Sequence, residues 1–272
     1  MTAVDTVDVA GLRIGFRRAG QGSGLVLLHG AYSDSRLWER QLDELSDEFT
    51  VIAWDAPGCG QSSDPGPGFD AADLAHCLAD FIHAMDLPRP HVLGLSWGAG
   101  FALELYRHHP GLPASLVLAS AYSGWAGSLP PEEVERRVTQ VRTELGLSPE
   151  QFLPGWIPTL LTERASHVLV AEVACLMSQF RPEGMRLLLQ LAGHADYRAV
   201  LPTIAIPTML LYGEEDRRSP LEVARDMRER IRGSTLSVIP AAGHLANIEA
   251  PLMFNGHIRH FLHTVEARAS RT

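Results

Sequence analysis

The sequence predicts an α/β protein with a mostly parallel sheet, flanked by helices and interrupted by one helical insertion. Short apolar runs alternate with stretches of helical spacing along most of the 272 residues, and this alternation is typical of a parallel sheet with helices on both faces. After Ala121 the alternation stops, and a stretch rich in proline and without a clear strand follows. We therefore expect a sheet domain in two parts, residues 1–122 and 197–272, around a helical lid at residues 123–196.

The expected elements follow in chain order. Residues 7–17 are predicted to form a hairpin that turns at Gly11. Apolar runs typical of buried strands occupy residues 25–28, 51–54, 92–95, 116–119, 208–212 and 236–239. Helical spacing covers residues 37–45, 71–85, 221–231 and 253–265 in the sheet domain, and residues 132–145, 165–180 and 183–192 in the lid.

The amino-acid composition favours a globular protein and argues against nucleic-acid-binding and membrane-spanning proteins. The chain is 46% hydrophobic and 20% charged, with a formal net charge of −9, which is typical of a globular domain and argues against a nucleic-acid partner. No apolar stretch approaches the roughly 18 residues of a membrane-spanning helix, and the first residues lack a basic, apolar leader. Three cysteines without metal-binding spacing suit a reducing compartment. We expect a cytoplasmic protein without membrane or metal; a homo-oligomer stays open.

One serine stands at the apex of a predicted strand, turn and helix. Gly94, Ser96 and Gly98 match the Gly-x-Ser-x-Gly nucleophile elbow, in which glycines flank a serine on a tight, strained turn. The five-residue pattern occurs by chance in many proteins, so its context matters. An apolar run precedes it at residues 92–95, and the helix-compatible residues 99–108 follow it. Ser96 is therefore the predicted nucleophile.

A nucleophilic serine needs a base, and the base needs an acid that orients it. His244 lies in a glycine-containing loop after the last predicted strand, at the edge where α/β sheets place their sites. Three carboxylates in a row, residues 214–216, follow the strand at 208–212. Asp216 is favoured among them, partly because the chain order Ser, Asp, His is the one that sheet enzymes of this kind use. The other two carboxylates are interpreted as an exposed helix cap.

An oxyanion formed at the serine needs two hydrogen-bond donors. The backbone N–H of Trp97 directly follows the nucleophile, and a second donor is expected in the loop after an earlier strand. The loop after residues 25–28 begins with His29, and we choose the Ala31 N–H. His29 is interpreted as a residue that organises this loop.

These motifs together resemble the α/β-hydrolase fold along nearly the whole chain. The matching segments, in the order and spacing of that superfamily, are residues 29–30, 55–62, 94–98, 213–216 and 243–244. The resemblance implies a mostly parallel eight-stranded sheet with an inserted helical lid. Among subfamilies the chain is most similar to lid-bearing carboxylic ester and lactone hydrolases, including proteins like 3-oxoadipate enol-lactonase.

Two differences from related subfamilies limit the possible reactions and the possible acid. A serine at position 96 stands where haloalkane dehalogenases and epoxide hydrolases carry aspartate. No carboxylate follows the strand at residues 116–119, so the acid position that some relatives use there is vacant, which leaves Asp216 with little competition.

The lid is expected to select the substrate. Candidate pocket residues are Tyr32, Tyr122, Trp125 and Trp156, although such residues also serve simply to pack lid helices onto a domain. The sequence thus predicts a serine hydrolase that cleaves an ester or lactone of a small organic substrate through an acyl-enzyme, without a cofactor. Alternatives are a carbon–carbon bond hydrolase, an acyltransferase or a perhydrolase of the same fold, and a hydrolase-like ligand-binding protein without turnover.

Overall fold

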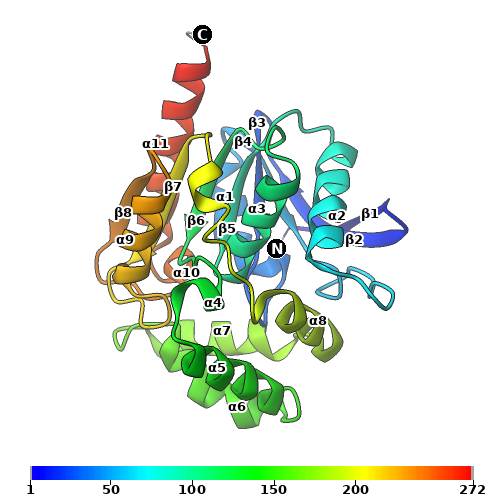
Figure 1. Cartoon of the computed structure of the whole chain (residues 1–272), viewed down its shortest axis with the longest axis vertical. Coiled ribbons are helices and arrows are strands. Elements are labelled where there is room, and N and C mark those ends of the chain that lie inside the picture. Colours follow the sequence, from blue (N-terminus) through cyan, green and yellow to red (C-terminus); the bar gives the residue numbers. More distant parts are fainter. Residues whose placement is uncertain (1, 271–272) are drawn as a thin grey trace.

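Eight strands form one sheet in the order β1-β2-β4-β3-β5-β6-β7-β8. The computed structural model describes residues 2–270 (Figure 1). The strands are β1 Asp5–Val9, β2 Leu12–Ala19, β3 Ser23–Leu28, β4 Phe49–Trp54, β5 His91–Leu95, β6 Ser115–Ala119, β7 Thr208–Gly213 and β8 Thr235–Ile239. Strand β2 pairs antiparallel with β1 and with β4, and all other pairs are parallel. The expected mostly parallel sheet of eight strands is confirmed.

A two-residue turn closes the hairpin of β1 and β2. Ala10 and Gly11 both have positive φ, of 51° and 77°, between the paired residues Val9 and Leu12. Two left-handed residues make the turn whose twist matches that of the flanking strands. The hairpin predicted at residues 7–17 therefore forms, with its turn at Gly11.

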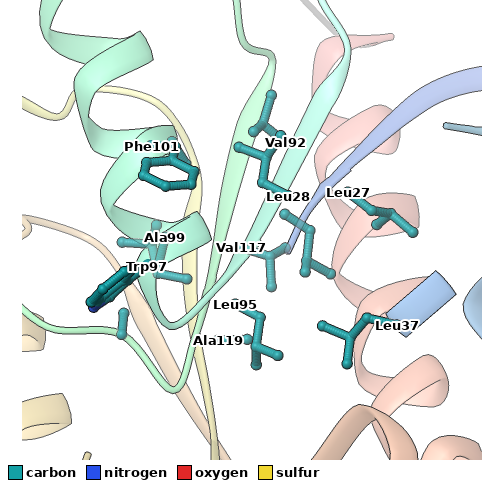
Figure 2. Close-up of a cluster of buried hydrophobic side chains, with 14 of the residues drawn as sticks. Leu27, Leu28, Leu37, Val92, Leu95, Trp97, Ala99, Phe101, Val117 and Ala119 are labelled. Carbon is teal, nitrogen blue, oxygen red and sulfur yellow. The ribbon is translucent and has the colours of Figure 1, made fainter. Parts of the chain in front are cut away.

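The central strands are apolar because the sheet is covered on both faces. Every residue of β4, β5, β6 and β7 is buried, as expected of parallel strands between helices. Figure 2 shows side chains from β3, β5 and β6 gathered between helix α3 (Trp97–His108) on one side and α11 (Pro251–Ala269) on the other. Leu37, in the 3-10 helix η1 (Ser35–Trp38), joins this cluster. This core fixes the strand ends from which the site is built.

The remaining helices of the sheet domain flank the same strands. They are α1 Glu39–Leu45, α2 Ala71–Ala84, α9 Leu221–Arg230 and α10 Ala246–Glu249, with the 3-10 helix η3 Leu201–Thr203. Helix α2 packs against α3, and α1 packs against α11. Within residues 2–270, no helix has both the length and the apolar character that crossing a membrane requires.

Between β6 and β7 the chain forms helices and no strand. They are α4 Trp125–Ser128, α5 Pro131–Glu144, α6 Pro149–Trp156, η2 Ile157–Thr159, α7 His167–Ser178 and α8 Pro182–Ala192. In Figure 1 they gather below one end of the sheet. We call residues 123–196 the helical insertion; its role as a lid stays a prediction.

One helix of the insertion differs from expectation. The prolines at 149 and 154 predict interruptions, yet both lie within α6. Pro149 occupies the first helical position, where an N–H has no intrahelical acceptor in any case. Ser148 and Gln151 form a capping box in front of it. Pro154 lies inside this short helix, which continues to Trp156.

Candidate active site

Five loops meet at one edge of the sheet because the strands that precede them are parallel. They follow β3, β5, β6, β7 and β8, and the helical insertion leaves and re-enters the sheet domain at this edge. The loops and the insertion surround about 580 Å³ of empty space, part of it open to solvent. Residues from all five loops and from the insertion line this cavity, which is the place that such sheets offer to a ligand.

Ser96 occupies a strained turn between β5 and α3. Its backbone has φ 55° and ψ −115°, a region that residues other than glycine rarely adopt. The turn closes against neighbouring backbone: a Cβ added to Gly94 would lie 2.2 Å from the Gly98 carbonyl oxygen, and one added to Gly98 would lie 2.1 Å from that of Leu28. Neither position has room for a side chain. Steric crowding therefore requires glycine at both flanking positions of the predicted elbow.

His244 and Asp216 form a buried pair. The imidazole Nδ1 lies 2.9 Å from Asp216 Oδ2 and 3.0 Å from Oδ1, and both residues are buried. The backbone N–H groups of Arg218 and Ser219 each donate to Asp216 Oδ1 at 2.9 Å. The carboxylate is therefore fixed by its own loop and orients the imidazole, as an acid and base pair requires.

The surroundings of Asp216 favour its ionised form. Burial by itself would raise the pKa of this carboxyl, but the charge and hydrogen bond of His244 and the Ser219 N–H hold the pKa below its ordinary value of 3.8. At neutral pH the acid is therefore a carboxylate that stabilises a charged imidazole beside it.

Ser96 and His244 both line the cavity. Within residues 2–270 no hydrogen bond is found between the serine hydroxyl and the imidazole. Catalytic hydrogen bonds are often long in free enzymes and shorten when substrate binds. The shared cavity wall, rather than a formed hydrogen bond, brings Ser96 and His244 together here.

The two predicted oxyanion donors also line the cavity. Neither the Ala31 N–H nor the Trp97 N–H has an acceptor among residues 2–270. Gly30 allows the first of these loops to lie close to Ser96, since a Cβ added to it would lie 3.3 Å from Ser96 Cβ. Two free N–H groups beside a serine are suited to stabilise an oxyanion.

Two further residues order the loops around these donors. His29 accepts a hydrogen bond from the Ala56 N–H at 3.0 Å through Nε2, and its Nδ1 lies 2.9 Å from the Gly30 carbonyl oxygen. Asp55 accepts from the Ser35 and Gln61 N–H groups at 2.8 Å each. His29 thus organises its loop, as interpreted from the sequence, and residues 55–62 form a structural turn.

Three of the four candidate pocket residues line the cavity, namely Tyr122, Trp125 and Trp156. Tyr32 does not belong to the cavity wall. Its ring packs against Phe152, Trp156 and Phe180 at centroid distances of 5.0 to 5.2 Å, and its hydroxyl donates to Glu144. Tyr32 was predicted to line the pocket because it directly follows Ala31. Its backbone has a positive φ of 54°, and the chain turns at this residue.

The cavity wall also contains residues that the sequence did not single out. They are Ser33, Leu37, Leu160, Val173, Leu176, Arg218, Leu245 and Ile248. Most are apolar positions of helices or loops, for which no sequence signal distinguishes cavity from core. Arg218 could have been predicted to lie near the site, because it follows the candidate acid Asp216 by two residues.

Within residues 2–270, histidine, cysteine, aspartate and glutamate side chains form no group of three placed to hold a metal ion. Cys59, Cys77 and Cys175 are free thiols.

Comparison with known proteins places this geometry in context. A sequence profile described as "Alpha/beta hydrolase family" matches residues 25–255. The solved structure of a thermophilic esterase from Thermogutta terrifontis is similar, with a TM-score of 0.85 and 29% identity over 96% of this chain and 97% of that one. 3-oxoadipate enol-lactonase 2 from Acinetobacter baylyi is 25% identical over 98% of this chain and 97% of its own length. Pyrrolizixenacetamide deacetylase from Xenorhabdus hominickii is 25% identical over 95% and 98%.

Proposed function

The chain belongs to the alpha/beta hydrolase family, and from that premise we propose that it is a serine hydrolase that cleaves a carboxylic ester or lactone of a small organic molecule. The proposed catalytic residues are Ser96, His244 and Asp216. The observation that carries the proposal is the buried His244–Asp216 pair, with 2.9 Å between Nδ1 and Oδ2, on the same cavity as the strained Ser96. The esterase and enol-lactonase named above act on bonds of this kind, which supports the ester or lactone as substrate.

The proposed reaction has two stages. His244 accepts the hydroxyl proton of Ser96 while the oxygen attacks the carbonyl carbon, and the Ala31 and Trp97 N–H groups stabilise the tetrahedral oxyanion. The imidazolium returns its proton to the leaving alkoxide, so that an acyl-serine remains. Water then attacks the acyl carbon while His244 takes a proton from it. The bond from the acyl carbon to Ser96 Oγ breaks, the imidazolium returns the proton to Ser96 Oγ, and the acid is released. Asp216 stabilises the imidazolium in both stages.

A labelling and turnover experiment tests the proposal. Ser96→Ala should lower kcat for 4-nitrophenyl butyrate by at least about three orders of magnitude, and it should abolish labelling by a fluorophosphonate probe. Ser178→Ala is the matched control, because that hydroxyl bonds to the Cys175 carbonyl within α7. Undiminished turnover or labelling of folded Ser96→Ala would overturn the assignment.

Product analysis distinguishes hydrolysis from the alternatives of the same fold. Acid and alcohol in equal amounts are expected from the ester in water, with or without added competing alcohol or peroxide. A transferred acyl group or a peracid as the main product would instead identify an acyltransferase or perhydrolase. Location in the cytoplasm and independence from cofactors stay predictions from the sequence.

A further inference from the structure

Arg218 places a cation on the cavity wall without a carboxylate partner. The side chain is half-buried and lines the same cavity as Ser96 and His244. Among residues 2–270 no carboxylate lies within ion-pair distance of its guanidinium, whose one hydrogen bond goes to Thr159 Oγ1 at 3.3 Å. Arg217 is different, since it is exposed and forms an ion pair with Glu163 at 2.9 Å.

The two carboxylates that act electrostatically on Arg218 have other partners. Asp216 binds His244, and Glu144 accepts hydrogen bonds from Tyr32 and Gln140. Burial lowers the pKa of Arg218, as expected for a cation that no carboxylate neutralises, although an arginine stays protonated at neutral pH. A half-buried charge without a partner of opposite charge costs free energy, so the fold alone gives no reason for this cation.

Trp156 fixes the plane of the Arg218 guanidinium. The Arg218 Cζ lies 3.9 Å from the centroid of the Trp156 ring, a stacked arrangement that leaves the edges of the guanidinium free to donate. Trp156 also lines the cavity. A cation on the cavity wall that has free donor edges and no carboxylate partner among residues 2–270 points to an anionic ligand.

The rest of the wall limits the form of that ligand. Away from Arg218 the wall is mostly apolar, through Leu37, Leu160, Val173, Leu176, Met177 and Ile248. The neighbouring Arg137 is already engaged, by Glu133 at 2.7 Å and by the Tyr122 hydroxyl at 2.9 Å. One free planar guanidinium matches a carboxylate, whereas a phosphate dianion would favour several unpaired cations.

We propose that Arg218 is a specificity-determining residue that binds a carboxylate group of the substrate. The preferred substrate is then an ester or lactone that carries a free carboxylate on an aliphatic chain. This proposal rests on the proposed hydrolase function, but its anion site can be tested separately.

The kinetic test compares two esters that differ in one charge. Mono-4-nitrophenyl glutarate carries a carboxylate at the end of the acyl chain, and 4-nitrophenyl pentanoate carries a methyl group there. Arg218→Gln should lower the ratio of their kcat/KM values about ten- to a hundredfold, mainly through KM for the glutarate ester. Arg217→Gln is the matched control and should leave the ratio within about twofold, because its side chain is exposed. Equal ratios in the two variants would overturn the proposal.

Arg218→Lys provides a second variant if Arg218→Gln fails to fold, as judged by circular dichroism. Lysine keeps the charge and loses the planar fork. We therefore expect a ratio between that of the wild type and that of the glutamine variant, and a ratio equal to the wild type would contradict bidentate binding.

A binding experiment without turnover separates this proposal from the hydrolase function. Calorimetry should detect glutarate binding to Ser96→Ala, and at least tenfold weaker binding to Ser96→Ala with Arg218→Gln. Glutarate binding that depends on Arg218 would support the anion site even if neither ester were hydrolysed. Turnover by Ser96 without such dependence would overturn the anion site alone. Inorganic phosphate that binds more tightly than glutarate would contradict the choice of carboxylate.

Discussion

The hydroxyl of Tyr32 donates a 2.9 Å hydrogen bond to Glu144 Oε2, which joins the loop of the proposed oxyanion donor Ala31 to helix α5 of the insertion. Both side chains are buried, and Tyr32 has a left-handed backbone with φ 54°. Burial first, and then the charge of Glu144, raise the pKa of the phenol, so it remains a donor at any ordinary pH. One hydrogen bond thus links the position of the insertion to the site.

Tyr32→Phe tests this link. Glu144 would keep its hydrogen bond from Gln140 and lose the one from Tyr32, which should lower the free energy of unfolding by about 1–3 kcal/mol. We also expect a lower kcat, because the Ala31 loop loses its anchor. Urea unfolding and steady-state kinetics measure the two effects. The control variant is Tyr106→Phe, because the Tyr106 hydroxyl donates to the Thr203 carbonyl. This variant should be less stable than the wild type but should have the same kcat. Equal losses of kcat in the two variants would contradict the link.

Stability at acid pH should depend on Asp216. The carboxyl titrates near 3.8 when the chain is unfolded and below that value when it is folded. The ionised form therefore favours the folded state above the unfolded pKa, and this contribution is lost as pH falls through the folded pKa. Between about pH 5 and pH 2 the wild type should lose unfolding free energy more steeply than Asp216→Asn. Urea unfolding at several pH values measures the slopes, and parallel slopes would show that Asp216 does not titrate in this way.

Two glycine substitutions should have opposite effects. A Cβ at Gly98 would lie 2.1 Å from the Leu28 carbonyl oxygen, so Gly98→Ala must displace backbone and should destabilise the protein by about 3 kcal/mol or more. Gly155, in α6, has open space around it. Gly155→Ala should therefore stabilise by about 0.5–1 kcal/mol. Thermal unfolding of both variants checks the pair, and a Gly98→Ala variant as stable as wild type would refute the steric account of the elbow.

Glu249 should act as a positioning residue for His244. Its Oε2 accepts the Gly243 N–H at 2.8 Å, and its Oε1 accepts the Thr162 N–H at 2.9 Å. Glutamine would replace one acceptor by a donor and leave an N–H unpaired. Glu249→Gln should lower kcat about ten- to a hundredfold with little change in KM.

Glu222→Gln is the matched control for Glu249, because Glu222 is exposed and pairs with Arg225 within α9. It should leave both kinetic constants unchanged. A rise of KM with constant kcat in Glu249→Gln would indicate a role in substrate binding instead.

Most of the sheet was predictable because its central strands are buried and apolar on both faces, whereas the flanking helices are apolar on one face. The runs at residues 92–95 and 208–212 lie within the strands β5 and β7, and the hairpin turn falls at Gly11. Helix α6 was missed because its prolines at 149 and 154 normally interrupt helices, whereas a capping box and a first-position proline make this short helix possible. Helix propensity is a property of single residues and does not include the capping box that precedes this helix.

Local sequence patterns predicted one part of the candidate site, and only the tertiary structure revealed the other part. The tight turn at Ser96, the loop positions of His244 and Asp216 and the expectation of a hydrolase fold follow from the sequence, because glycine spacing and strand ends are local properties. The tertiary structure decided that Tyr32 packs against Trp156 in an aromatic cluster without lining the cavity itself, and that Arg218 lines the cavity without a carboxylate partner among residues 2–270. Which carboxylates pair with which cations depends on contacts between segments far apart in the chain, such as Tyr32 with Glu144, and no local pattern encodes those contacts.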